Sequence, residues 1–244
     1  MSAAPALLLT RPETGSRALC AELQDAGYAV YNAPMLNIHH HDGDNAPSPH
    51  GYQAIVITSA NAAPALRTIG APADMPVFAV GDASTQAAKS HGMRTVISAD
   101  GDSGDLRALI TTRCRAKDGA LLYIRGRDVA GDLAGDLQAD GLVLESWIAY
   151  RAKPVPALPA PAAGRDKLAG YDAVLFFSQR TARHFAELVH GIHAESGLQH
   201  TLALCISHKV LSCVHGLPWA ENYVARRPDR HSMIALTQTC VPVD

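Results

Sequence analysis

The sequence predicts an α/β fold made of two similar halves, each a doubly wound parallel sheet with helices on both faces. Three features indicate this. The segment Leu7–Leu36 aligns without a gap on Leu121–Tyr150. Strand-like runs such as Ala54–Ile57 and Ala173–Phe177 are continuously apolar, which is typical of parallel strands buried on both faces. Helix-like segments of about ten residues separate these runs, as in chains that alternate strand and helix.

The aligned pair defines the repeating unit. Arg11 falls on Arg125, and Gly27 falls on Gly141. Each copy has a short apolar run, a polar loop that opens with arginine, an amphipathic segment, a glycine and a second apolar run. This order predicts strand, helix and strand. The glycine stands where a helix commonly ends in a residue of left-handed conformation.

Three more pairs of segments continue the repeat, and each copy again has an apolar run followed by a helix-like segment. The pairs are Ala54–Leu66 with Ala173–Phe185, Phe78–Gly92 with Ala203–Gly216, and Val96–Ile110 with Val224–Leu236. The repeat predicts two similar halves, and it leaves open how they pair.

Two polar or proline-rich stretches, His39–Gly51 and Lys153–Gly170, are predicted to be loops or linkers. The chain is expected to cross between the halves near Pro34–Ile38 and Ser146–Arg151. The run His39-His40-His41 lies in the first stretch, where a flexible backbone makes a poor rigid metal site, so we expect no metal there.

Composition excludes several classes of protein. The chain has 244 residues, is 48% hydrophobic and has a net charge of −2, so no global field attracts nucleic acid. No apolar stretch is long enough to span a membrane, and Met1–Leu9 does not resemble a signal peptide. The five cysteines are scattered and odd in number. A disulfide framework and a structural zinc site are therefore not expected, and a reducing, cytoplasmic location is.

Candidate binding residues follow the predicted strands, because ligands of open parallel sheets bind beyond the carboxyl ends of the strands. Ser59 and Asn61 follow one strand, and Gly81 and Ser84 follow the next. The serines and Asn61 could cap helices or contact an anion, with equal weight. Gly81 would permit a tight turn or a close backbone approach.

Two arginines are the best candidate partners for carboxylates. Arg11 and Arg125 are each predicted to lie just past the first strand of their unit. Because their positions are equivalent, binding of a carboxylate and a solvated surface position have equal weight. Tyr150 ends an apolar run near a chain crossing. It is either packed core or a hydrogen-bond donor to a ligand.

Other motifs point away from known chemistries. Gly101–Gly104 (GDSG) resembles a serine-protease segment. It precedes a helix predicted to begin near Asp105, so we interpret it as a capping loop. Neither the dinucleotide-binding nor the phosphate-loop glycine motif occurs. This argues against nicotinamide and ATP chemistry, and we expect no cofactor.

An ordered set of motifs resembles the uroporphyrinogen-III synthase family over nearly the whole chain. The motifs are Thr10-Arg11-Pro12, Thr58–Ala62, Ala79–Ser84, Tyr123–Gly126 and Tyr150. The resemblance implies two α/β lobes, residues 1–37 plus 151–244 and residues 38–150, joined by a two-stranded connection with a cleft between them. It implies hydroxymethylbilane as the substrate, cyclised with inversion of ring D through a spiro intermediate and with loss of water. It also implies a cytoplasmic monomer without cofactor or metal, which could meet the preceding pathway enzyme transiently.

The resemblance assigns the site residues. Tyr150 is the catalytic candidate, because a hydrogen bond could assist loss of the hydroxyl group. The candidates for substrate binding are Arg11, Ser59, Asn61, Gly81, Ser84, Arg125, Ser178 and Gln179.

The second half departs from the family pattern. The departures are at Phe177, Gln179, Ser207 and Asp229. The alternatives are therefore a divergent member with weak activity, or a non-catalytic two-lobed binder or sensor of a small ligand.

Overall fold

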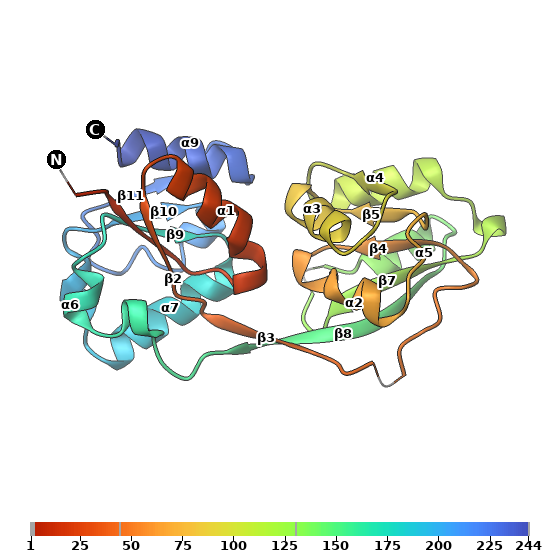
Figure 1. Ribbon diagram of the computed structural model, residues 1–244, viewed down its shortest axis with the longest axis horizontal. Helices are drawn as coiled ribbons and strands as arrows, with labels where there is room; N and C mark the ends of the chain where they lie inside the picture. Colours follow the sequence, from red (N-terminus) through yellow and green to blue (C-terminus); the bar gives the residue numbers. More distant parts are fainter. Residues whose placement is uncertain (1–2, 44, 130, 244) are drawn as a thin grey trace. The chain divides into compact units, whose positions relative to one another are not determined.

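A computed structural model describes residues 3–43, 45–129 and 131–243 of the chain. The chain divides into two compact units (Figure 1). Unit 1 comprises Met1–Asn37 and Lys153–Asp244, and unit 2 comprises Ile38–Ala152. The chain passes between the units inside β3 (Leu36–His40) and β8 (Leu144–Pro154), which are neighbours in one sheet. The return to unit 1 follows Ala152, slightly later than the sequence predicted.

The sheet of unit 1 has the strand order β11-β10-β9-β1-β2, and its neighbouring strands are parallel. The strands are β1 (Ala6–Leu9), β2 (Ala29–Asn32), β9 (Ala173–Phe176), β10 (Leu202–Cys205) and β11 (Glu221–Val224). The helices are α1 (Glu13–Asp25), α6 (Arg165–Leu168), α7 (Gln179–Gly191), α8 (His208–Leu211) and α9 (Arg230–Cys240). The short 3₁₀ segments η3 (Ala160–Ala162) and η4 (Glu195–Leu198) also belong to this unit.

The sheet of unit 2 has the order β3-β8-β7-β4-β5-β6, and its strands from β8 to β6 are parallel to their neighbours. The remaining strands are β4 (Tyr52–Ile57), β5 (Val77–Ala79), β6 (Val96–Ser98) and β7 (Ala120–Gly126). The helices are α2 (Pro64–Thr68), α3 (Asp82–Ser90), α4 (Ser103–Arg113) and α5 (Leu133–Ala139), with η1 (Ala60–Ala62) and η2 (Ala116–Asp118).

The two sheets share one topology with a different chain order. In unit 1 the first two strands of the chain, β1 and β2, lie beside β9, β10 and β11. In unit 2 the equivalent pair, β7 and β8, comes last in the chain and lies beside β4, β5 and β6. Unit 2 is thus a circularly permuted copy of the arrangement in unit 1. The permutation explains why Leu121–Tyr150 repeats Leu7–Leu36 although it lies at the other end of its unit.

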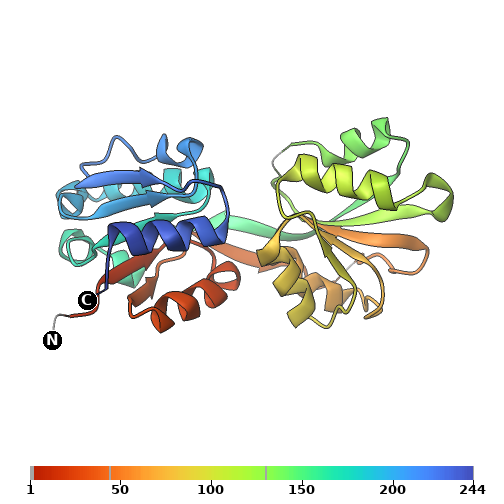
Figure 2. The ribbon, with the colours of Figure 1, turned by 90° about the horizontal axis from the view of Figure 1, so that it is seen from above.

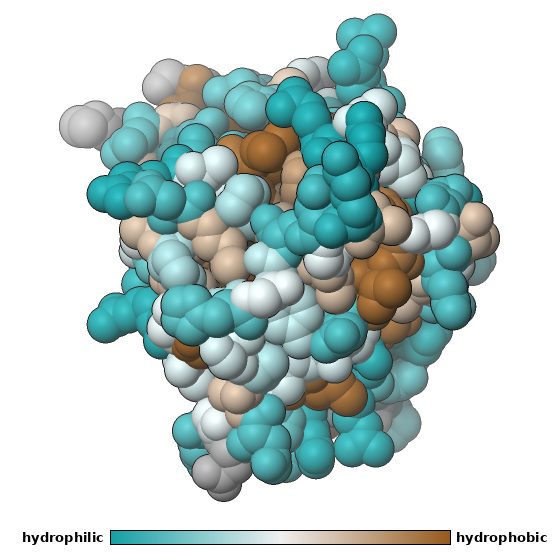
Figure 3. Space-filling model, turned by 90° about the vertical axis from the view of Figure 1, so that its right-hand side faces the viewer, coloured by the Kyte–Doolittle hydropathy of each residue, from teal (hydrophilic) through white to brown (hydrophobic). Residues whose placement is uncertain are grey.

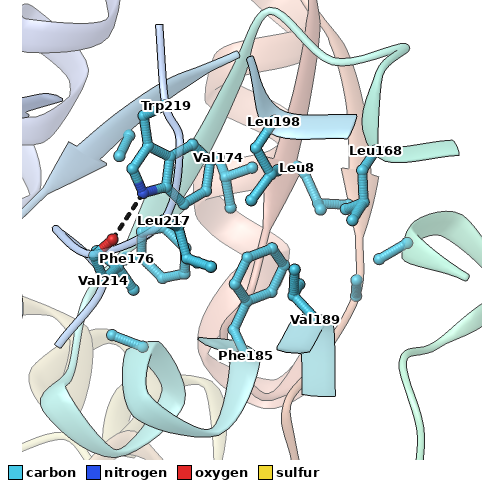
Figure 4. Packing of buried hydrophobic residues seen from close by; sticks show 14 of the residues in the cluster. Leu8, Leu168, Val174, Phe176, Phe185, Val189, Leu198, Val214, Leu217 and Trp219 are labelled. Carbon is cyan, nitrogen blue, oxygen red and sulfur yellow. Dashed lines mark hydrogen bonds between the residues drawn. The ribbon is translucent and has the colours of Figure 1, made fainter. Parts of the chain in front are cut away.

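Both sheets are covered on both faces, which confirms the doubly wound prediction. In unit 1, Leu7 and Leu9 of β1 pack with α1 and α9, whereas Leu8 packs with α6, α7 and α8. Figure 2 shows α1 and α9 side by side. Figure 4 shows the core on the other face, where Phe176 and Phe185 lie at 5.2 Å between ring centroids and the Trp219 indole donates to the carbonyl of Val214. In unit 2, helices α2 and α3 cover one face, and α4 and α5 cover the other.

The repeat extends to the helix ends. The φ angle is +96° at Gly27, after α1, and +81° at Gly141, after α5. The amide of Tyr28 donates to the carbonyl of Leu23, and the amide of Leu142 donates to that of Leu137. This is the Schellman pattern, so the predicted left-handed glycines are confirmed.

Several local predictions were wrong. The stretch His39–Gly51 is not all linker, because β3 includes His39 and His40, and the amide of His41 donates to the carbonyl of Ala149 on β8. Lys153–Gly170 contains the end of β8, η3 and α6. Helix α4 begins at Ser103 rather than near Asp105, since Asp102 caps it through a capping box with Asp105. Composition alone could not show the pairing of β3 with β8, because these strands lie far apart in the sequence.

Within the described residues, no helix is both long and apolar enough to cross a membrane. The outer face of unit 2 in Figure 3 is mostly hydrophilic, and its apolar patches are small and separate. Such scattered apolar groups are normal on a folded surface.

The glycine caps give a test of the repeat. Gly141→Ala is expected to destabilise the protein by about 1–2 kcal/mol, because an L side chain strains the left-handed conformation. An added Cβ there meets nothing within 4 Å, so packing contributes no penalty. Gly191→Ala is the matched control, since Gly191 lies inside α7 with similarly open space. It should stabilise by about 0.5–1 kcal/mol. Urea unfolding measures both, and equal effects would contradict the cap assignment.

Candidate functional site

Strand order locates one candidate site in each unit. In a doubly wound sheet, ligands bind where the strand order reverses, at the carboxyl ends of the two strands beside that point. In unit 1 these strands are β1 and β9, and in unit 2 they are β7 and β4. Arg11 and Ser178 follow the first pair, whereas Ser59 and the loop after Gly126 follow the second. Most of the predicted residues therefore lie at these two edges.

Tyr150 lies at the carboxyl edge of unit 2, although its strand was predicted to end there. Strand β8 continues to Pro154, and Tyr150 pairs with Gly126, the last residue of β7. Its side chain is 8% exposed, and burial raises the pKa of the phenol. Hydrogen bonding with the Ser59 side chain and with the Gly126 backbone opposes that rise in pKa.

Gly126 makes the position of the Tyr150 ring possible. A Cβ at residue 126 would lie 2.7 Å from two carbons of the Tyr150 ring and 3.0 Å from its hydroxyl oxygen. The tyrosine therefore occupies the space that any other residue at 126 would fill. The sequence motif Tyr123–Gly126 includes this glycine, but only the pairing of β7 with β8 shows that the glycine makes room for the Tyr150 ring.

Further polar and aromatic groups surround the phenol. The Ser59 hydroxyl caps η1 by accepting from the amide of Asn61 at 3.2 Å, so its capping role is confirmed. The hydroxyls of Thr58 and Tyr123 lie 2.8 Å apart. The His40 ring centroid is 6.0 Å from that of Tyr150. Burial and nearby His91 lower the pKa of His40, so this imidazole is neutral at pH 7. No role was predicted from the sequence for Tyr123 or His40. The pairing of their strands within the sheet brings both residues to this edge.

Gly81 and Ser84 lie at the start of α3, as predicted. Gly81 is extended at φ −167°, a conformation open to any residue, so of the two predicted alternatives the close backbone approach remains and the tight turn does not. An added Cβ at Gly81 would meet nothing within 4 Å, which leaves space beside the backbone. Ser84 is 4% exposed in the first turn of the helix.

Arg125 is not placed as the sequence suggested. It lies inside β7 rather than after it, and its Nη1 donates to the carbonyls of Gly126 at 3.2 Å and Arg127 at 3.4 Å. Strand β1 ends at Leu9, whereas β7 continues to Gly126, so Arg11 follows its strand and Arg125 lies within its own. The repeat aligned their sequence positions but could not give the length of each strand.

Arg11 lies in the loop after β1 and stacks on an aromatic ring. Its guanidinium carbon lies 4.7 Å from the centroid of Phe177, the residue after β9. Burial, followed by the nearby positive charge of Arg230, lowers the pKa of Arg11. Among the residues that the structure describes, no carboxylate pairs with this guanidinium. A partly buried cation without a protein counter-ion is suited to an anionic ligand.

The two edges differ in charge. The loops at the carboxyl edge of unit 1 carry Arg11, Arg180, His208, Lys209, Arg226, Arg227, Arg230 and His231, with the acids Glu13 and Asp229. The equivalent loops of unit 2 carry Asp82, Asp100, Asp102, Asp128 and Asp132, with the cation Arg127. Unit 1 is therefore the half suited to hold carboxylates, and unit 2 offers hydroxyl groups and a phenol.

Two residues at or beside the divergent positions of unit 1, Ser178 and Asp229, cap helices. Ser178 caps α7 by accepting from the amide of Thr181, and Gln179 is the exposed first residue of that helix. Asp229 caps α9 by accepting from the amide of Ser232 at 2.7 Å. Asp229 thus performs the capping that a hydroxyl residue would perform, and this bond lowers its pKa.

A surface hollow of about 700 Å³ lies at a carboxyl edge, in the loop between β11 and α9, lined by Arg226, Arg227, Asp229, His231 and Ser232. Another, of about 330 Å³, lies beside Cys114 and Gly141 at the amino ends of β7 and β8, and it contains no predicted site residue.

A protein-family model described as uroporphyrinogen-III synthase matches residues 17–235, which is most of the chain. The chain belongs to the uroporphyrinogen-III synthase family. It is accordingly a cyclising lyase of tetrapyrrole biosynthesis, as expected from the resemblance, and this is favoured over a non-catalytic binder. No curated protein sequence matches the chain.

Solved structures agree on the fold. The uroporphyrinogen-III synthetase of Helicobacter pylori matches with a TM-score of 0.61 at 15% identity, covering 96% of this chain and 99% of that one. A mutant uroporphyrinogen III synthase of the extremely thermophilic bacterium Thermus thermophilus matches with a TM-score of 0.51, also at 15% identity, covering 98% and 99%. At this identity the matches establish the two-lobed α/β fold.

The contact between Gly126 and Tyr150 gives a test of the unit 2 site. Gly126→Ala is expected to destabilise by about 1–3 kcal/mol, because the methyl group and the ring compete for one space. Gly81→Ala should leave stability nearly unchanged, since its Cβ has room.

Chemical denaturation of both variants, repeated in a Tyr150→Ala background, shows whether the loss of stability comes from the Tyr150 ring. In that background the cost of Gly126→Ala should largely disappear. A cost that persists would contradict the assigned contact.

Proposed function

We propose that this chain closes hydroxymethylbilane to uroporphyrinogen III with inversion of ring D. Tyr150 assists loss of the hydroxyl group, and the cationic edge of unit 1 binds substrate carboxylates. The supporting observation is the state of Tyr150. Its phenol is buried beside Ser59 and Gly126, and a protonated phenol can donate to a departing group. The raised pKa keeps the phenol protonated at neutral pH.

The reaction needs one donated proton and firm control of conformation. The pyrrole nitrogen supplies electrons as the C–O bond of the hydroxymethyl group breaks, and the phenol donates to the oxygen, which leaves as water. The substituted carbon of ring D attacks the azafulvene to form a spiro intermediate. Fragmentation and closure at the other position release the proton that restores the phenol. The competing direct closure is excluded by orientation.

Binding is assigned to residues of both edges. Arg11 pairs with a carboxylate, and Gly81 allows a close approach to its backbone, because the space beside it is open. Helix N-termini contribute amide groups that favour anions. The remaining candidates for contact with substrate are Ser59, Asn61, Ser84, Arg125, Ser178 and Gln179.

The cellular setting is proposed from the cysteines. All five cysteines are free thiols, which suits a reducing compartment such as the cytoplasm. We expect a monomer that meets the enzyme supplying its unstable substrate only transiently. Sedimentation of the purified protein checks the monomer.

The decisive experiment is a product assay. Purified protein is incubated with hydroxymethylbilane generated in place by the preceding deaminase, and the oxidised products are separated by chromatography. The type III isomer is expected in excess over that of a protein-free reaction. A product mixture containing only the non-inverted isomer would contradict the proposed activity.

Tyr150→Phe tests the role of the phenol. The ring still fits against Gly126, so the fold should persist while kcat falls by about tenfold or more. KM should change far less, because the hydroxyl acts on the departing group rather than on carboxylates. Steady-state kinetics measure both constants, and an equal loss in kcat and in binding would remove the catalytic assignment.

A further inference from the structure

Arg11 is fixed on two sides. Its guanidinium lies over the Phe177 ring at 4.7 Å. On another side it contacts α1, because a Cβ at Gly15 would lie 3.2 Å from Nη2 and 3.4 Å from Nε of Arg11. Glycine at position 15 therefore leaves the space that the guanidinium occupies. An aromatic face holds a guanidinium without neutralising its charge.

Arg230 lies against the same helix. It is the first residue of α9, its Nη2 donates to the carbonyl of Ala18 at 3.4 Å, and it forms an ion pair with Glu22. The side chain of Arg230 is 24% exposed and that of Glu22 is 40% exposed. Arg230 thus crosses from one helix to the other, and Figure 2 shows these helices side by side.

The contacts on α1 bring the two arginines together. Gly15, Ala18 and Glu22 are separated by three and four residues, so they share one face of the helix. Gly15 contacts Arg11, and Ala18 contacts Arg230. Three residues of α-helix rise about 4.5 Å, so the two arginines contact α1 within one turn of each other, and the charge of Arg230 acts on Arg11.

This juxtaposition has an energetic cost unless an anion is present. Glu22 neutralises Arg230, whereas within the described part of the chain no carboxylate pairs with Arg11. Two neighbouring like charges repel, and partial removal from water strengthens the repulsion. A carboxylate that accepts from both guanidinium groups would remove the repulsion through charge-assisted hydrogen bonds.

We propose that Arg11 and Arg230 form one carboxylate subsite at the edge of unit 1, in which Phe177 positions Arg11 and Glu22 positions Arg230. The subsite deepens the proposed function, because the carboxylate would belong to a side chain of the linear tetrapyrrole. It also gives a role to Phe177, which departs from the family pattern, because the Phe177 ring supports the guanidinium of Arg11.

Arg230→Gln tests the second cation. KM for hydroxymethylbilane should rise about tenfold, since one charge-assisted hydrogen bond is lost, while kcat changes little. Arg230→Lys should recover part of the affinity. Arg17→Gln is the matched control, because Arg17 pairs with Glu13 on the exposed side of α1, 84% exposed. It should leave both constants unchanged.

The platform is tested by Phe177→Leu and Phe177→Tyr. The leucine variant loses the aromatic face and should raise KM, and the tyrosine variant restores the face and should restore KM. A merely structural role would affect the melting temperature of both variants without this pattern in KM. An unchanged KM in Arg230→Gln, with the fold verified by circular dichroism, would overturn the subsite.

A binding experiment separates this proposal from the catalytic one. Propane-1,2,3-tricarboxylate is titrated into wild type, Arg230→Gln and Arg17→Gln at constant ionic strength and followed by amide chemical shifts. Binding should weaken about tenfold in Arg230→Gln alone. If the wild type made no type III product but showed this pattern, the activity would fail and the subsite would stand. Equal titration curves for all three proteins would overturn the subsite.

Discussion

Both candidate sites depend on the order of the parallel strands within each sheet. Each sheet is extended in two directions from a central pair of strands, β1 with β9 and β7 with β4. Helices that follow such a pair leave on opposite faces, so the loops diverge and expose backbone amides and side chains at one edge. The permuted chain order of unit 2 leaves this geometry intact. A duplicated fold could therefore supply two edges with different chemistry.

The chemistry of the edges diverged through burial and charge. In unit 2, the absence of a side chain at Gly126 lets the Tyr150 ring lie against the strand, where burial keeps its proton. In unit 1, the Phe177 ring and the α1 backbone support a guanidinium whose counter-ion the described chain does not supply. Unit 2 thus offers a neutral hydrogen-bond donor at its edge, and unit 1 offers a cation suited to an anionic group.

Much of the site could be inferred from sequence because it follows strands directly. Ser59, Gly81, Ser84 and Arg11 were placed correctly at strand ends, since the apolar runs end there. Arg125 was misplaced because β7 continues to Gly126, and strand length depends on pairing with β8. Phe177 was noticed only as a departure, and Arg230 was missed. Its partners on α1 are more than two hundred residues away in sequence.

The sequence by itself determined the class of fold, the duplication, the glycine caps and the family, because these depend on local periodicity and on residues close together in the chain. The tertiary structure alone decided which groups share an edge: Tyr150 with Gly126, Arg11 with Phe177, and Arg230 with Glu22. Each pair joins separate strands or helices, and the packing of the sheet and its helices, rather than local preference, sets their separation.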